Sequence, residues 1–157
     1  IALGLKSESE YCLIDALEGS ENFKERFNAV SPKGIKCEAV YETEKKVNIA
    51  SDIVFADYEI EGLNVFDVDE ILSKKQFFIT DKNKNVKEVR DKIVSLKFDK
   101  NKLIARLKFG NETLRPDYLA KKLQELYGGE HVNILKKNVR FKNDTDVETY
   151  LENTRCR

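Results

Sequence analysis

The sequence is poor in the residues that bind transition metals, with one His and three Cys among 157 residues. Cys12, Cys37 and Cys156 are far apart and form no Cys-x-x-Cys pair. Tetrahedral zinc sites and cysteine-held iron–sulfur clusters need several such ligands at close spacing. We therefore expect no metal site and no cofactor bound by this chain.

Three signatures of membrane or enzymatic function are also missing. No apolar run approaches the roughly 18 residues of a membrane span, which excludes an integral membrane protein. Gly34, Gly62 and Gly110 are isolated, so there is no glycine-rich phosphate loop. His131 lies in a predicted connection, and the sequence places neither a nucleophile nor an orienting acid beside it. We assign no catalytic residue.

Apolar residues are nonetheless abundant, at 41% of the chain with 9 Phe and 6 Tyr. A chain of this length buries about 68–70% of its surface on folding, enough for a core without disulfides, and intrinsic disorder is excluded. Unpaired thiols without a signal peptide favour the cytoplasm. We expect Cys12 and Cys37 to be small buried hydrophobes. The chain opens in apolar sequence without Met, so we expect a fragment.

Hydrophobic periodicity divides the chain into three parts. Residues 1–48 predict a partial β-α-β module plus a linker, residues 49–142 a second module, and residues 143–157 a short C-terminal helix that begins with a capping box at Thr145.

The first module contains one clear helix, which Ser20 caps and Pro32 and Gly34 end. Its apolar residues recur at helical spacing, so we expect them to be buried; they are Phe23, Phe27 and Val30. Apolar residues alternate with polar ones over 35–41, which predicts a strand.

The second module predicts the order β-α-β-β-β-α-β with short connections. The expected elements are strands over 53–60, 76–80, 103–109 and 132–141, an extended stretch over 86–98 with a kink near Arg90, and helices over 64–74 and 116–127. We expect Leu119, Leu123 and Leu126 to be buried. The predicted fold class is α+β, a ferredoxin-like antiparallel sheet with helices on one face.

Charge is unevenly distributed although the net charge is zero. Residues 1–70 hold 7 basic and 16 acidic side chains, whereas residues 71–142 hold 19 basic and 8 acidic. Such asymmetry points to an anionic partner, and an open sheet face of this topology suits single-stranded RNA. The candidate polyanion-binding residues are Lys97, Lys102, Arg106, Lys108 and Arg140.

Two interpretations of these charges stand side by side. The basic residues bind RNA or another polyanion, or they are solvated and paired with the acidic first half of the chain. Phe77 and Phe78 place one ring on each face of their strand, where the outer ring is either a stacking platform or covered by a neighbouring segment.

Several strings resemble the radical-SAM-linked protein family, a bacterial family without an assigned activity. They are Gly4-Leu5-Lys6-Ser7-Glu8-Ser9-Glu10-Tyr11, the segment from Phe27 to Ile35, Ala56-Asp57-Tyr58, Val89-Arg90-Asp91-Lys92-Ile93 and Leu114-Arg115-Pro116-Asp117-Tyr118-Leu119. The resemblance covers about residues 1–142. It marks Ser7, Glu8, Glu10 and Tyr11 as a candidate site, for which local capping of a turn is the alternative role.

The resemblance implies a radical-SAM enzyme as partner, encoded beside or fused to such proteins. Family members usually carry a further N-terminal stretch with a Ser-His-Leu-Asp-like segment, which is missing here. The chain also lacks the three close Cys of the cluster, so radical chemistry belongs to the partner. We expect an accessory module that presents RNA or an RNA-bound substrate; the alternatives are an enzyme with its catalytic residues in the missing segment, or a structural protein–protein adaptor.

Overall fold

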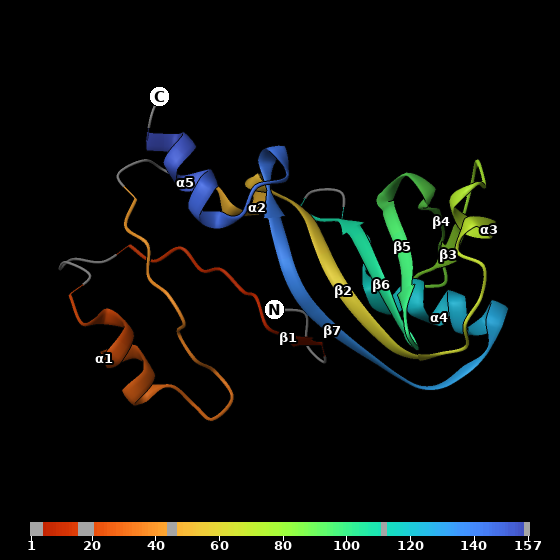
Figure 1. The fold of residues 1–157 in the computed structure, drawn as a ribbon, viewed down its shortest axis with the longest axis horizontal. Helices are drawn as coiled ribbons and strands as arrows, with labels where there is room; N and C mark the ends of the chain where they lie inside the picture. Colours follow the sequence, from red (N-terminus) through yellow and green to blue (C-terminus); the bar gives the residue numbers. More distant parts are fainter. Residues whose placement is uncertain (1–4, 16–20, 44–46, 111–112, 156–157) are drawn as a thin grey trace.

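The computed structural model describes residues 5–15, 21–43, 47–110 and 113–155. The helices and strands of this part of the chain, shown in Figure 1, are β1 (Lys6–Ser7), α1 (Phe23–Val30), α2 (Ile49–Asp52), β2 (Ile53–Leu63), α3 (Asp69–Leu72), β3 (Phe78–Thr80), β4 (Val86–Glu88), β5 (Ile93–Asp99), β6 (Lys102–Lys108), α4 (Pro116–Tyr127), β7 (Gly129–Phe141) and α5 (Val147–Arg155).

The main sheet has the strand order β1-β7-β2-β6-β5. The pairs β7–β2, β2–β6 and β6–β5 are antiparallel, whereas β1 pairs in parallel with β7. If β1 is left out, the sheet has the spatial order β7-β2-β6-β5. Numbered along the chain, these four strands are the fourth, first, third and second. This is the ferredoxin-like arrangement, so the predicted α+β class is confirmed.

One face of this sheet carries the core. Alternate residues of β6 point to it, and Leu103, Ala105 and Leu107 have no exposed surface. Helix α4 packs against this face through Leu119 and Leu123, which are equally inaccessible to solvent. The opposite face has no helix over it in the described part of the chain, and its polar residues alternate with the core residues along each strand.

Helix α4 has the predicted bounds, 116–127. Pro116 suits the first turn because its missing N–H has no partner there, and Gly128 ends the helix at φ 82°. Leu119 and Leu123 are buried as predicted, but the expectation for Leu126 is wrong, because its side chain is 47% exposed. Leu126 lies past the edge of the stripe that meets the sheet.

The irregular pairing between the end of β2 and the start of β7 requires two glycines. Gly62 and Gly129 have φ of 88° and 130°, and a Cβ at Gly62 would overlap the Glu130 carbonyl oxygen. A Cβ at Gly129 would likewise overlap the Gly62 carbonyl oxygen. The backbones of the two longest strands therefore come closer here than any larger residue permits.

Two predicted elements differ from the structure. The helix over 64–74 is reduced to the single turn α3, because the Asn64 side chain donates to the Tyr127 carbonyl (3.1 Å) and does not cap a helix. The segment 86–98 has its predicted kink, a 3₁₀ turn at Arg90–Lys92 between β4 and β5. Strands β3 and β4 form a separate two-stranded sheet beside α4.

The N-terminal part differs more. Residues 35–41 form no strand and pair with no strand of the described chain. Helix α1 has no buried residue: Phe23 and Phe27 are half-buried and Val30 is 83% exposed, so their predicted burial is wrong. The predicted cap, Ser20, lies outside the described residues.

Helix α5 is fixed to the sheet by Asp52, one of two buried polar residues in the described chain. Its carboxylate accepts hydrogen bonds from the Tyr150 hydroxyl (2.6 Å) and the Lys142 ammonium (2.5 Å). The Tyr150 ring stacks on Phe141 at 4.7 Å. The helix start differs from the predicted capping box, because Asp146 accepts the capping N–H bond.

Among the described residues, no helix combines the length and the apolarity needed to span a membrane.

Candidate functional site

The open sheet face carries the predicted basic residues, and most of them are paired within the chain. Lys102 on β6 contacts Glu59 (3.2 Å) and Glu61 (2.7 Å) on β2. Its carboxylate neighbours, Glu61 first, raise the pKa of Lys102. The β2 strand thus supplies a row of acids that runs beside the basic row of β6.

The Arg106 guanidinium is the most heavily paired member of this row. It binds Asp57 with two hydrogen bonds (2.6 and 3.0 Å) and Asp144 with a contact of 3.1 Å. The hydrogen bond to Asp57 is the main cause of its raised pKa, against the opposing effect of burial. A two-pronged guanidinium–carboxylate pair of this geometry leaves few donors for a phosphate.

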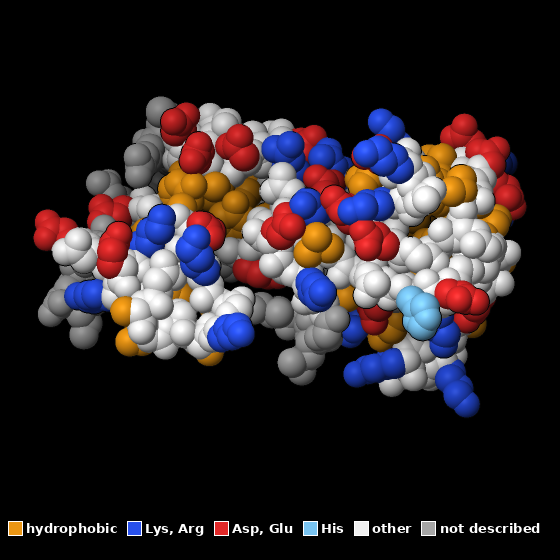
Figure 2. All heavy atoms as spheres, turned by 60° about the horizontal axis from the view of Figure 1, so that its bottom comes forward, with side chains coloured by type: hydrophobic (Ala, Val, Ile, Leu, Met, Phe, Trp, Pro, Cys, Tyr) orange, Lys and Arg blue, Asp and Glu red, His pale blue; other side chains and the backbone are white. Residues whose placement is uncertain are grey.

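The remaining candidates of the basic face differ in their partners. Lys108 contacts Asp91 at 3.3 Å, and the Arg140 Nε lies 3.8 Å from Asp144 without a hydrogen bond. Lys97 is exposed and forms no ion pair within the described residues. Figure 2 shows acidic and basic side chains side by side across the middle of the molecule. The acidic first half therefore neutralises much of this face.

The acids missed by our candidate list had a visible signal. Asp57, Glu59 and Glu61 alternate along a predicted strand, so they share one of its faces. What the sequence does not show is that β6 lies next to this strand in a register that sets Asp57 opposite Arg106. That register depends on contacts between residues 49 positions apart.

The Ser-Glu-x-Glu motif lies at the edge of the sheet, on and after β1. Ser7 pairs with Lys136 in the strand register, and its hydroxyl forms a local hydrogen bond with the Ser9 backbone. Glu8 contacts Lys137 on the open face at 2.5 Å and is the main cause of the raised pKa of that lysine. The motif thus fixes β1 onto β7.

Glu10 points to the other face of the sheet, where it forms an ion pair with Lys136 (2.5 Å). Lys136 is 7% exposed and lies opposite Tyr58, with its ammonium 5.5 Å from the Phe109 ring centre. Burial, with Glu10 and Asp117 nearby, raises the pKa of Tyr58 to about 12. The Tyr58 phenol is therefore neutral at neutral pH and lies opposite a lysine that is ion-paired with Glu10.

Tyr11, the last residue of the motif, packs its ring edge-on against Phe141 at 5.4 Å. The four motif residues are therefore split. Glu8 and Glu10 lie on opposite faces of the sheet edge, each engaged by a lysine of β7, and Tyr11 joins the core periphery. Among the described residues, these side chains therefore do not converge on one another.

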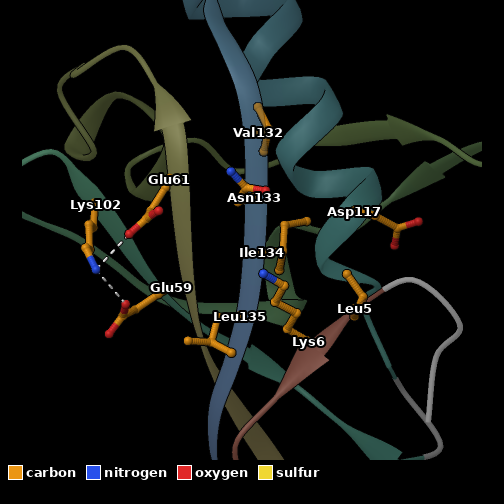
Figure 3. Close-up of a pocket in the computed structure, with 10 residues that line it drawn as sticks. All are labelled: Leu5, Lys6, Glu59, Glu61, Lys102, Asp117, Val132, Asn133, Ile134 and Leu135. Carbon is orange, nitrogen blue, oxygen red and sulfur yellow. Dashed lines mark hydrogen bonds and ion pairs between the residues drawn. The ribbon is translucent and has the colours of Figure 1, made fainter. Parts of the chain in front are cut away.

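An open hollow of about 500 Å³ lies along β7 just before its contact with β1 (Figure 3). Leu5, Lys6, Asn133 and Ile134 line it, and the ion-paired Lys102 stands on its far side. Asp117, on its rim, is held by the Arg115 guanidinium through two hydrogen bonds of 2.9 and 2.8 Å. Most charged groups of the hollow thus already have protein partners.

The later family landmarks have structural roles. The Arg90 guanidinium donates to the backbone carbonyls of Leu72 (2.5 Å) and Ile93 (2.8 Å) and so ties α3 to β5. Arg115, paired with Asp117, lies 4.9 Å from the Tyr118 ring centre at the start of α4. Arg90 thus joins two elements of the fold, whereas Arg115 contacts its near neighbours in sequence.

The described residues contain no group of three or more His, Cys, Asp or Glu that could hold a metal ion. The burial expected for the cysteines is wrong: Cys12 is exposed and Cys37 is half-buried, because the segments that carry them do not enter the core. Cys156 lies outside the described residues. His131 is exposed on β7 with φ 53°.

The fold and these surfaces define a ferredoxin-like α+β protein whose open sheet face is largely charge-paired. The chain matches the family model DUF2344, described as an uncharacterized protein conserved in bacteria, over residues 1–156, and it belongs to that family. No curated protein and no solved structure matches the chain.

Proposed function

We propose that this chain is an accessory module that docks onto a radical-SAM enzyme through its N-terminal arm, here defined as residues 12–15 and 21–43. The arm carries the observation behind the proposal. Six of the eleven exposed large hydrophobic side chains of the described chain lie in it: Leu13, Ile14, Val30, Ile35, Val40 and Tyr41. Exposed apolar surface of this kind, gathered in one region, is typical of protein interfaces.

The arm is locally ordered although it buries little. Phe23 and Phe27 stack at 5.9 Å, and the Asn28 side chain bridges both backbone groups of Cys37 (2.7 and 3.0 Å). The Ser31 hydroxyl donates to the Phe27 carbonyl at 2.8 Å. A pre-shaped apolar surface costs less ordering entropy on binding than a disordered segment would.

One polar contact links the arm to the C-terminal helix. The Tyr41 hydroxyl donates to Glu148 (3.1 Å), and burial together with this bond raises the pKa of Tyr41. A small hollow of about 190 Å³ lies between Tyr41 and Leu151. Figure 2 shows uncovered hydrophobic side chains at this end of the molecule. The docking surface therefore extends from the arm towards α5.

The partner class comes from the resemblance in the N-terminal motif and the later landmarks, which implies a radical-SAM enzyme beside or fused to such proteins. The reaction belongs to that enzyme in this proposal. The chain positions the enzyme's substrate, and its own contribution is binding. RNA, or a substrate bound to RNA, is the substrate class that the basic second half favours.

The test is a binding titration with a radical-SAM enzyme of the class that the resemblance implies. Val30→Asp places a charge on a valine that is 83% exposed, so it leaves folding intact and weakens the complex at least tenfold. Val86→Asp is the matched control, since Val86 is 69% exposed on β4 at the other end of the molecule. Equal affinity for both variants and the parent chain contradicts docking through the arm.

A further inference from the structure

The β3–β4 hairpin presents an aromatic ring on a rigid base. Its inner face is anchored in the core by Phe77 and Ile79, which are 4% and 2% exposed, and β3 packs against α4. Phe78 points the opposite way and is 46% exposed. Val86 and Glu88, on the neighbouring strand, share this outer face, with Glu88 directly opposite Phe78. The Glu88 carboxylate accepts hydrogen bonds from the backbone N–H groups of Phe77 (3.1 Å) and Arg90 (2.7 Å). The ring is therefore fixed in position but uncovered.

The tip of the hairpin is held by one carboxylate. Asp81 accepts hydrogen bonds from the backbone N–H groups of Asn83 (2.8 Å) and Asn85 (3.0 Å), and it pairs with Lys87 (3.0 Å). The bond from Lys87 and those from the backbone lower the pKa of Asp81 to about 2. Lys82 and Lys84 project from this ordered turn and are exposed.

Lys82 and Lys84 in the hairpin turn, and Lys75 and Lys92 before and after the hairpin in sequence, differ from several lysines of the sheet face in their partners. Lys75, Lys82, Lys84 and Lys92 form no ion pair within the part of the chain that the structure describes. On the sheet face, by contrast, Lys102 has two carboxylate partners. Lys82 and Lys84, in the turn of the hairpin that carries Phe78, therefore keep a positive charge that the described residues do not neutralise, as Lys97 does on the sheet face.

We propose that the outer face and tip of the β3–β4 hairpin bind single-stranded nucleic acid. Lys82 and Lys84 contact phosphates, and the Phe78 ring stacks on an unpaired base with Val86 beside it. An exposed ring flanked by unpaired lysines suits a single strand because every base offers a π-face and every nucleotide a phosphate. This inference deepens the proposed function, since it names a substrate-binding surface distinct from the docking arm.

An acidic protein is the competing partner for a basic patch. Lysine is depleted at the centres of protein–protein interfaces, whereas lysine around an exposed aromatic ring is usual in single-strand binding surfaces. The hairpin also lies at the opposite end of the molecule from α1 (Figure 1), so a strand and a docked enzyme have separate surfaces.

Fluorescence anisotropy with labelled twelve-nucleotide oligo-U and oligo-dT over a salt series tests the proposal. Phe78→Ala removes one stacked base and weakens binding about 5- to 150-fold. The double variant Lys82→Gln/Lys84→Gln flattens the log–log salt slope by about 1.4, at about 0.7 per phosphate contact. The matched control Lys102→Gln/Lys108→Gln removes the same charge from paired lysines and changes the slope by less than half as much.

Three results overturn the proposal. Oligonucleotide binding that is absent at low salt, or unchanged in the Phe78 and Lys82/Lys84 variants, removes the hairpin as the site. A larger effect from Lys102→Gln/Lys108→Gln moves the site to the sheet face. Polyglutamate bound as tightly as oligo-U, with equal loss in the hairpin variants, identifies an acidic protein as the partner. Normal enzyme docking in any of these cases leaves the arm proposal standing.

Discussion

The N-terminal arm and the main sheet with α4, together called the sheet module below, contain similar kinds of apolar residues but bury them very differently. Helix α4 buries Leu119 and Leu123 completely, whereas α1 buries no residue and leaves Val30 83% exposed. Both helices have an apolar stripe at helical spacing. An apolar stripe therefore shows only that one side of a helix can be buried. The apolar side of α4 is buried against the sheet, whereas that of α1 is not buried within the described chain.

The difference has a physical origin in the sheet. The antiparallel strands β2, β6 and β7 create a continuous apolar face that α4 fits, and this burial stabilises the module. Within the part of the chain that the structure describes, residues 35–41 have no partner strand and offer α1 no such face. The stability of the chain thus resides in the sheet module, and the arm's apolar side chains remain available to another molecule.

The largest difference in stability is expected between one side-chain truncation in α4 and one in α1. Leu123→Ala leaves a cavity in the core and lowers the free energy of unfolding by about 2–5 kcal/mol. Val30→Ala removes exposed atoms and changes it by less than about 0.5 kcal/mol. Urea denaturation measures both. Equal losses would mean that the arm folds as part of the core.

A second comparison concerns the link between α5 and the sheet module. Asp52→Ala removes the acceptor of the Tyr150 hydroxyl and lowers the free energy of unfolding by about 1–3 kcal/mol, since a buried donor loses its partner. Tyr150→Phe removes the hydroxyl donor, but Asp52 keeps its bond with Lys142, so this variant lowers the free energy of unfolding by less. Thermal or urea unfolding of the two variants gives this order, and the reverse order contradicts it.

Stability at low pH should depend on the same Asp52 carboxylate. Burial acts to raise the pKa of Asp52, but the hydrogen bonds from Lys142 and Tyr150 prevail and hold it below its ordinary value of 3.8. The folded state therefore favours the carboxylate, and its stabilising contribution is present above about pH 4 and is lost as the pH falls through the folded-state pKa. Asp52→Asn should flatten this part of the stability–pH curve; an unchanged curve would point to other carboxylates.

The smallest effect is expected on the open sheet face. Asp57 and Arg106 are only partly buried, so a double-mutant cycle of Asp57→Asn and Arg106→Gln should give a coupling free energy of about 1 kcal/mol or less. Added salt should reduce the coupling further. A coupling of several kcal/mol would mean that the paired charges are a main source of stability. That result would contradict the account in which burial of the apolar face stabilises the sheet module most.

Local signals predicted the sheet module well. Pro116 and Gly128 bracket α4, and the kink near Arg90 separates β4 from β5, as the sequence indicated. The failures arose where the outcome depends on distant partners. Residues 35–41 alternate like a strand but pair with no strand among the described residues, and Asn64 forms a hydrogen bond with Tyr127 on another element.

The candidate site shows the same division. Alternation placed Lys102 and Arg106 on one face correctly, and the charge asymmetry between the two halves was visible from counting. That Asp57 and Glu59 stand opposite them depends on strand order and register, which no local pattern contains. The same holds for Glu10, whose partner Lys136 is 126 positions away in the sequence.

Hydrogen exchange on α1 tests the docking account most directly. In the isolated chain the amides of Phe23–Val30 should exchange rapidly, while those of β2 and β6 are protected, because α1 buries no side chain. Adding the radical-SAM enzyme should slow exchange in α1 and leave β2 and β6 unchanged. Strong protection of α1 in the isolated chain, or rapid exchange that persists in the complex, would contradict the arm as the docking surface.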